Sequence, residues 1–225
     1  MKKRLIKSKE KNSEEETSKD SKEKFTIDLK QKAIEPYNMR ASKKDMKNSL
    51  SSKEIHNIDK DFMPQIMPKE AKLAQYDYSV DSKLFNEYFR GFSKETLMDM
   101  RELDTTIKDV EKMIIDLKKS IIRTKKDYIV YRGVIGKFDV NRFNKSGGFI
   151  ATSFDKAIAK GYTRGKGEVI AIKVPKGTPV MYIRHNSIYP DHIELLIPDN
   201  YSNLRKVIKK SRTYYVVTKK KLNNS

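Results

Sequence analysis

The chain has 225 residues, and its 49 Lys and Arg against 30 Asp and Glu give a formal net charge of +19 at pH 7. A charge of this sign favours an acidic partner such as nucleic acid, an anionic membrane or an acidic protein face, although a solvated lysine-rich surface gives the same total. Because the chain has no Cys, disulfides, thiolate metal sites and a cysteine nucleophile are excluded.

The first residues are basic, but no apolar core follows Leu5 and Ile6, so we expect neither a Sec-type signal nor a transmembrane insertion. We expect action in a cytoplasm, of the producing cell or of a host reached by a route that is not Sec. Residues 1–30 are almost all Lys, Glu, Ser and Asp and are predicted to form a disordered tail. Residues 31–75 are predicted to be a linker with possible short helices.

Residues 76–225 are predicted to form the folded domain, and its first part has helical periodicity. A short helix is expected over 82–92, closed by Gly91. Over 95–122 a long helix or helix pair is expected from one apolar stripe at three- and four-residue spacing, made of Leu103, Ile107, Val110, Ile114, Leu117 and Ile121.

After Arg123 the apolar pattern becomes alternating, which predicts strands. Between them a helix over 155–162 is expected to be capped by Asp155. Helices followed by strands predict an α+β fold. The expected strands are 128–131, 148–153, 168–174, 179–183, 193–197 and 213–217.

Three short motifs lie in the strand-rich part. "YIVYRG" ends a strand in Arg132 and Gly133, which suits either a phosphate site or a solvated turn. "GGFIATSFD" places hydroxyls at a strand end, where they can also cap the next helix. "YPDHIELLIPDN" puts His192 and Glu194 on one face of a strand, where a carboxylate and an imidazole can divide electrostatic and proton-transfer roles.

In their order, the motifs resemble the mono-ADP-ribosyltransferases, in particular the arginine-type toxin group and the clostridial Rho-modifying exoenzymes. The family pattern of Arg, Ser-Thr-Ser and Glu/Gln-x-Glu is similar to Arg132, Ala151-Thr152-Ser153 and His192-Ile193-Glu194 here. The likeness covers about residues 76–218. It includes "FNEYFRG" (85–91), similar to a helix whose Asn and Arg contact NAD, and "KGYTRGKG" (160–167), similar to a loop with a nicotinamide-stacking aromatic and a phosphate-binding Arg.

The resemblance implies a split mixed β-sandwich behind N-terminal helices, NAD as the substrate and no metal. It implies that Glu194, His192 and Ser153 are catalytic and that Tyr189 recognises the acceptor. It implies NAD contacts from Arg132, Gly133, Thr152, Tyr162, Arg164, Asn86 and Arg90. A toxin or a viral or phage effector that modifies a macromolecule is expected, with protein the first choice of acceptor and nucleic acid the second, and the chain is expected to be a monomer.

Two positions depart from the family pattern. Ala151 stands where the family has a Ser that orients the catalytic Glu, and His192 stands where it has the Glu or Gln that guides the acceptor residue. The resemblance implies that neither change removes NAD binding, while together they leave the acceptor type open. The alternative is a weak or inactive basic domain of the same fold that binds nucleic acid or a ribonucleoprotein, since residues 201–225 carry eight Lys or Arg and no acid.

Overall fold

A computed structural model describes residues 49–63, 66–209 and 212–219. The predicted tail over 1–30 lies outside them. The helices are α3 (Ser52–Phe62), α4 (Lys69–Val80), α5 (Ser82–Arg90), α6 (Lys94–Glu102), α7 (Ile107–Lys118), α8 (Val140–Ser146) and α9 (Lys156–Gly161), with 3-10 turns at Arg184–Asn186, Pro190–His192 and Asp199–Tyr201. In the described part of the chain, no helix is long and apolar enough to cross a bilayer.

The strands form one mixed sheet that is nearly divided in two. They are β1 (Ile122–Arg123), β2 (Tyr128–Ile135), β3 (Ile150–Ser153), β4 (Gly167–Val174), β5 (Pro179–Tyr182), β6 (Glu194–Ile197), β7 (Asn203–Lys209) and β8 (Arg212–Thr218). Their order is β1-β5-β6-β3-β2-β4-β8-β7. Only β4 and β8 run parallel. Because β3 and β2 share a single pair of partners, Tyr131 and Ser153, the sheet splits at that point.

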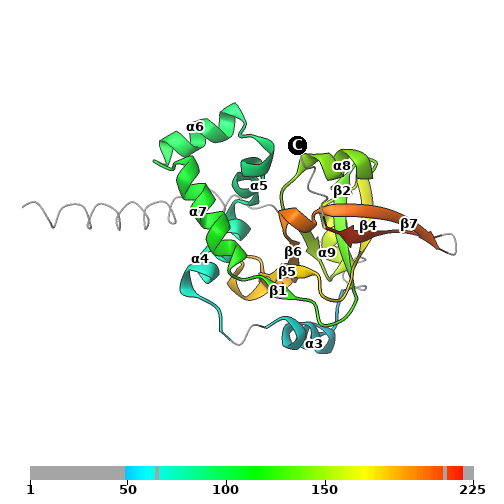
Figure 1. Cartoon of the computed structure of the whole chain (residues 1–225). Helices are drawn as coiled ribbons and strands as arrows, with labels where there is room; N and C mark the ends of the chain where they lie inside the picture. Colours follow the sequence, from blue (N-terminus) through cyan, green and yellow to red (C-terminus); the bar gives the residue numbers. More distant parts are fainter. Residues whose placement is uncertain (1–48, 64–65, 210–211, 220–225) are drawn as a thin grey trace, which may run out of the picture.

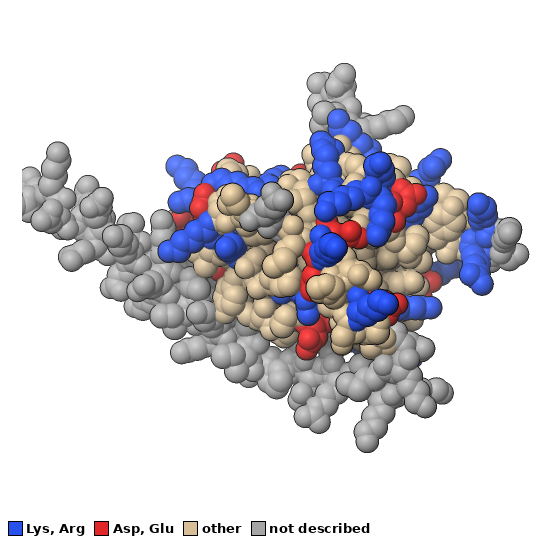
Figure 2. Space-filling model, turned by 90° about the horizontal axis from the view of Figure 1, so that it is seen from below, with Lys and Arg blue, Asp and Glu red and all other residues tan. Residues whose placement is uncertain are grey.

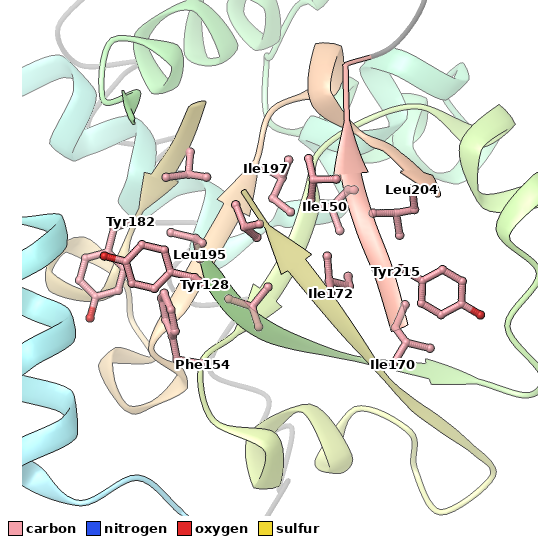
Figure 3. Close-up of a cluster of buried hydrophobic side chains, with 14 of the residues drawn as sticks. Tyr128, Ile150, Phe154, Ile170, Ile172, Tyr182, Leu195, Ile197, Leu204 and Tyr215 are labelled. Carbon is pink, nitrogen blue, oxygen red and sulfur yellow. The ribbon is translucent and has the colours of Figure 1, made fainter. Parts of the chain in front are cut away.

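The two halves of the sheet enclose the main core. Alternate residues of β5, β6 and β3, such as Leu195 and Ile150, pack with alternate residues of β2, β4 and β8, such as Val130 and Ile172 (Figure 3). Side chains one residue further along face the other way, because the side-chain period of a strand is two. On β6 that residue is Leu196, which packs against the helices in a second core.

Helices α4, α5, α6 and α7 lie together on one side of the sheet (Figure 1). Tyr78 of α4, Phe85 of α5, Met100 of α6 and Leu117 of α7 are all buried in the second core. The fold is therefore α+β, as the sequence predicts, with a helical layer, a half-sheet, the main core and the other half-sheet.

Several predicted elements are confirmed and others need correction. Helix α5 ends at Gly91 (φ 93°), and Asp155 caps α9 by accepting from two backbone amides. The segment 95–122 is a pair of helices, separated where Asp104 takes a left-handed conformation (φ 51°). Ile107, expected in the apolar stripe, is 51% exposed because it begins the second helix. Ile122 belongs to β1, while β7 and α8 have no counterpart among the expected elements.

The packed fold begins before residue 76, where the folded domain was expected to start. Phe62 of α3 is buried in the main core, with its ring centroid 4.7 Å from that of Tyr128 and 5.4 Å from that of Tyr182. The hydroxyls of these two tyrosines donate to Asp61 (2.9 Å) and Asp59 (2.7 Å). Helix α3 is therefore part of the domain, because it seals one end of the core.

Candidate active site

Glu194 begins β6, and the hydroxyls of β3 hold the backbone on both sides of it. The Ser153 hydroxyl donates to the carbonyl of His192 at 2.5 Å, and the Thr152 hydroxyl donates to the carbonyl of Leu195 at 2.7 Å. Among the described residues, no hydrogen bond reaches the Glu194 carboxylate. The two hydroxyls therefore position the residue through its neighbours' carbonyl groups and leave the carboxylate oxygens for a ligand.

The environment of Glu194 favours its neutral form. Burial raises the pKa of this carboxyl to about 7, and the nearby charge of Arg132 only partly opposes the rise. A perturbed carboxyl beside a buried cation is typical of a functional site, because folding alone does not need either group there. The pKa near neutrality means that small changes around the site control whether Glu194 is charged.

Arg132 projects from β2 into the same site. Its Nη1 donates to the carbonyl of Ala151 at 2.6 Å, and its guanidinium carbon lies 5.6 Å from the ring centroid of Phe143. Its Nε is buried and has no hydrogen-bond partner among the described residues. Burial, and next the charge of Arg90, lower the pKa of Arg132, while Glu194 acts in the opposite direction. A buried donor without a partner, close to a second guanidinium, suits an anionic ligand.

Helix α5 holds the turn that leads into β3. The Asn86 side-chain oxygen accepts from the backbone amide of Phe149 at 2.8 Å, and Arg90 Nε donates to the carbonyl of Gly147 at 3.1 Å. A Cβ at Gly148 would lie 2.5 Å from the Asn86 oxygen, so this approach requires glycine. The structure thus gives Asn86 a role in positioning β3, whereas the sequence predicts a contact with NAD.

Three aromatic residues form one edge of the site. The Tyr162 hydroxyl lies 2.9 Å from Nδ1 of His192, and the Tyr189 ring stacks on the imidazole at 4.9 Å with 11° between the planes. Tyr162 and Tyr189 are 42% and 37% exposed, so both rings are open to a ligand. Burial lowers the pKa of His192, and Asp191 opposes that shift, so the imidazole is neutral at pH 7. The charge of Glu194 helps to raise the pKa of Tyr162, after burial, which places this edge beside the carboxylate.

The loop that carries Tyr189 and His192 is anchored by α4. The Asn186 side-chain amide donates to the side-chain oxygen of Gln75 at 2.6 Å, and the amide of Ile188 donates to the Ser79 hydroxyl at 3.0 Å. Gln75 is fully buried. These contacts join residues more than 100 positions apart, so the sequence does not reveal them.

Gly133 and Arg164 differ from the other predicted residues. A Cβ at Gly133 would meet the carbonyl oxygen of Ala159 at 2.0 Å, so glycine is required there by the packing of α9 on β2. Arg164 is exposed on the turn after α9, with a left-handed backbone (φ 49°). Its contact with phosphates stays a prediction.

Tyr78 is a site residue that the sequence did not single out. Its side chain is 1% exposed, and its hydroxyl has no hydrogen-bond partner among the described residues. Burial raises its pKa, and the charge of Glu194 raises it further. Asn86 lies close enough to lower the pKa of Tyr78. However, its side-chain oxygen already accepts from the amide of Phe149, and its side-chain nitrogen donates to the carbonyl of Ser82. The one signal for Tyr78 in the sequence is its position as an aromatic residue two helical turns before "FNEYFRG".

The site joins a carboxylate, two guanidiniums, a neutral imidazole and exposed aromatic rings. Such a set can hold a phosphate-containing ligand, stack on a planar ring and stabilise positive charge near Glu194. In the described part of the chain, no group of three or more His, Cys, Asp or Glu is placed to hold a metal ion.

Comparison with known proteins gives structural likeness only. No protein-family model and no curated protein matches the chain. The Clostridium limosum C3 exoenzyme is similar with a TM-score of 0.48 at 18% identity, over 75% of this chain and 94% of that one. An ADP-ribosyltransferase from Clostridium botulinum is similar with a TM-score of 0.47 at 18% identity, over 73% of this chain and 92% of that one. The Vis toxin from Vibrio splendidus, an ADP-ribosyltransferase, is similar with a TM-score of 0.47 at 17% identity, over 78% of this chain and 89% of that one. The function proposed next therefore rests on the chain's own residues.

Proposed function

We propose that the chain is a mono-ADP-ribosyltransferase that transfers ADP-ribose from NAD to a macromolecular acceptor. The observation that carries the proposal is the half-buried Glu194, whose carboxyl has a pKa of about 7, near the half-buried Arg132, whose Nε is fully buried. The order of the sequence motifs supports it independently, because residues from β2, β3 and β6 that match one family pattern meet in one site.

Glu194 supplies the electrostatic part of the reaction. Breaking the bond between nicotinamide and ribose develops positive charge on the sugar ring, as in glycoside hydrolysis. An ionised Glu194 stabilises that charge more than it stabilises the ground state, and burial strengthens the interaction. The bonding electrons leave with nicotinamide, which departs neutral, and the acceptor nucleophile forms the new bond to the same ribose carbon.

Arg132 and Arg90 are assigned to the pyrophosphate. The unpartnered Nε of Arg132 would gain an acceptor, and a bound anion would relieve the repulsion between the two guanidiniums that lowers the pKa of Arg132. Tyr162 offers an exposed ring on which nicotinamide can stack.

His192 is assigned to the acceptor. As a base it must take the nucleophile's proton at Nε2, which requires that Nδ1 carries a proton and donates it to the Tyr162 hydroxyl 2.9 Å away. The lowered pKa keeps the imidazole neutral and therefore able to accept a proton at pH 7. Tyr189, stacked on the ring, holds its orientation and offers an exposed face to the acceptor.

The test is incubation with labelled NAD and a whole-cell lysate, with and without nuclease. The variants are Glu194→Ala and the matched control Glu102→Ala, whose carboxylate is exposed on α6. Wild type and control should transfer label, while Glu194→Ala should bind NAD by calorimetry and transfer none. Label removed by nuclease identifies a nucleic-acid acceptor, and label that persists identifies protein.

Two results contradict the proposal. If Glu194→Ala transfers label at the wild-type rate, Glu194 has no catalytic role. If wild type neither cleaves NAD nor binds it, the alternative of a basic binding domain replaces the enzyme.

A further inference from the structure

The strands β7 and β8 form a ribbon that extends beyond the rest of the sheet. Seven residue pairs join them, from Asn203 and Thr218 to Lys209 and Arg212. Only Tyr215 and Val216 of β8 pair with β4, so the outer part of the ribbon has no other strand beside it. Figure 1 shows it pointing away from the body of the domain, on the side opposite α4 and α7.

The ribbon concentrates positive charge without compensation. Arg205, Lys206, Lys209 and Arg212 are all exposed, and none of them forms an ion pair with any described residue. Lys209 and Arg212 are directly opposite one another across the ribbon. Like charges at opposed positions destabilise a β-ladder, so this arrangement reduces the stability of the free protein.

Some lysines elsewhere on the domain form ion pairs with acids. Lys and Arg cover much of the face seen in Figure 2. On the body of the domain five of the described lysines pair with acids: Lys83 with Glu87 and Glu95, Lys118 with Asp199, Lys119 with Glu70 and Asp116, Lys126 with Asp61 and Lys173 with Asp127. The ribbon differs from these lysines because no described acid pairs with its four cations and because Lys209 and Arg212 stand opposite one another.

Protection of the sheet edge explains only part of the pattern. Charged residues on an edge strand discourage pairing with another chain. That role needs charge on both strands of the outer ribbon, since neither has a further strand beside it there, and a mixture of signs would serve it without repulsion. Because β4 pairs only with Tyr215 and Val216, Arg212 also lies on an unpaired edge, but edge protection does not explain why its like charge stands directly opposite Lys209.

We propose that the β7–β8 ribbon docks on the phosphodiester backbone of nucleic acid. Seven residues of strand span roughly 24 Å, a length over which a nucleic acid presents many phosphates. The exposed Ile208 (68%) and the half-buried Tyr214 lie among the cations and can contact sugars and bases. A two-stranded ribbon enters the major groove of B-form DNA but not that of A-form RNA, so duplex DNA and single-stranded RNA are the two sources to compare.

Helix α8 connects the ribbon with the candidate active site. The Asn144 side chain donates to the Leu204 carbonyl at 2.9 Å and accepts from the Leu204 amide at 2.8 Å, at the base of the ribbon. The preceding residue, Phe143, lies against the Arg132 guanidinium. Nucleic acid docked along the base of the ribbon would therefore lie near the site, although its binding needs neither Glu194 nor NAD.

The test measures binding of the full chain to labelled 20-mers of duplex DNA and of single-stranded RNA by fluorescence anisotropy, across a salt series. One variant changes Arg205, Lys206, Lys209 and Arg212 to Gln. The matched control changes Lys69, Lys72, Lys108 and Lys112 to Gln, which are exposed on α4 and α7, so both variants lose the same charge. At 100 mM salt the ribbon variant should bind at least about 100-fold more weakly than wild type. The slope of log K against log salt, which is negative, should become less steep by about 3. The control should stay within about threefold of wild type.

A second variant distinguishes a loss of phosphate contacts from misfolding. Lys209→Gln with Arg212→Gln removes the like-charged pair, so it should unfold at a higher temperature than wild type while the salt slope falls by about 2. Equal losses in ribbon and control variants would overturn the proposal, since they would mean diffuse attraction by net charge. Equally tight binding to polyglutamate, or binding to anionic lipid vesicles alone, would also overturn it. Glu194→Ala should bind both 20-mers as wild type does, which separates this result from the enzymatic one.

Discussion

Replacement of Glu194 by Gln should stabilise the free protein at alkaline pH while it abolishes NAD cleavage. Gln has the shape of the protonated carboxylic acid but cannot ionise, so it removes only the charged form. The Glu194 pKa is raised from a reference value of 4.5 to about 7 because the carboxylate is buried. The folded protein therefore holds this proton more tightly than the unfolded chain does.

The size of the effect follows from linkage between protonation and folding. A pKa difference of about 2.5, at about 1.4 kcal/mol for each pKa unit, corresponds to about 3.5 kcal/mol. The favourable contribution of protonated Glu194 is fully present below pH 4.5 and is lost as the pH rises through about 7. Wild type and Glu194→Gln should thus have similar unfolding free energies near pH 4, and the variant should be more stable by about 3.5 kcal/mol at pH 8.5.

Urea unfolding followed by circular dichroism at several pH values measures this difference. Glu102→Gln, exposed on α6, is the control and should show no such trend. Because the reaction needs the ionised carboxylate, kcat/KM of wild type should rise with pH through about 7. A difference between Glu194→Gln and wild type that does not change with pH, or a less stable variant at pH 8.5, would refute the reasoning.

Two further predictions concern the ligand-facing groups. Arg132→Ala should raise the NAD dissociation constant at least about tenfold by calorimetry, since a buried charge-assisted contact is lost, while Arg101→Ala on the exposed face of α6 should not change it. An unchanged constant would remove Arg132 from the site. Tyr78→Phe should leave the free protein as stable or up to about 1 kcal/mol more stable, because it deletes a buried hydroxyl without a partner, yet should slow NAD cleavage. Lower stability with normal turnover would instead make that hydroxyl structural.

Local signals in the chain were sufficient for most of the elements. Gly91 and Asp155 mark the end of α5 and the start of α9 because their effects act within a few residues. The alternation on "EVIAIKV" located β4 for the same reason. The strand β7 was missed because its segment, "NLRKVIK", lacks that alternation: four of its residues are exposed on a ribbon with little core to face.

The sequence named most residues of the candidate site, though not Tyr78, and their roles stay predictions; the contacts that shape the site were not predicted. Ser153 was expected to be catalytic, and in the structure its hydroxyl donates to the carbonyl of His192 and so positions Glu194 only indirectly. Gly133 was expected to admit a ligand, whereas the close carbonyl of Ala159 already requires glycine there. The motif order indicated which residues meet, but not which atoms of them meet.

The sequence by itself determined the net charge, the α+β order of elements and the positions of the motif residues, because all three depend on composition or on spacing along the chain. Only the tertiary structure decided that Tyr78 lies beside Glu194, that α3 seals the core and that Lys209 opposes Arg212. Each of these depends on distance through space between segments that the chain folds together. Burial, and with it the raised pKa of Glu194, exists only once those segments have excluded water.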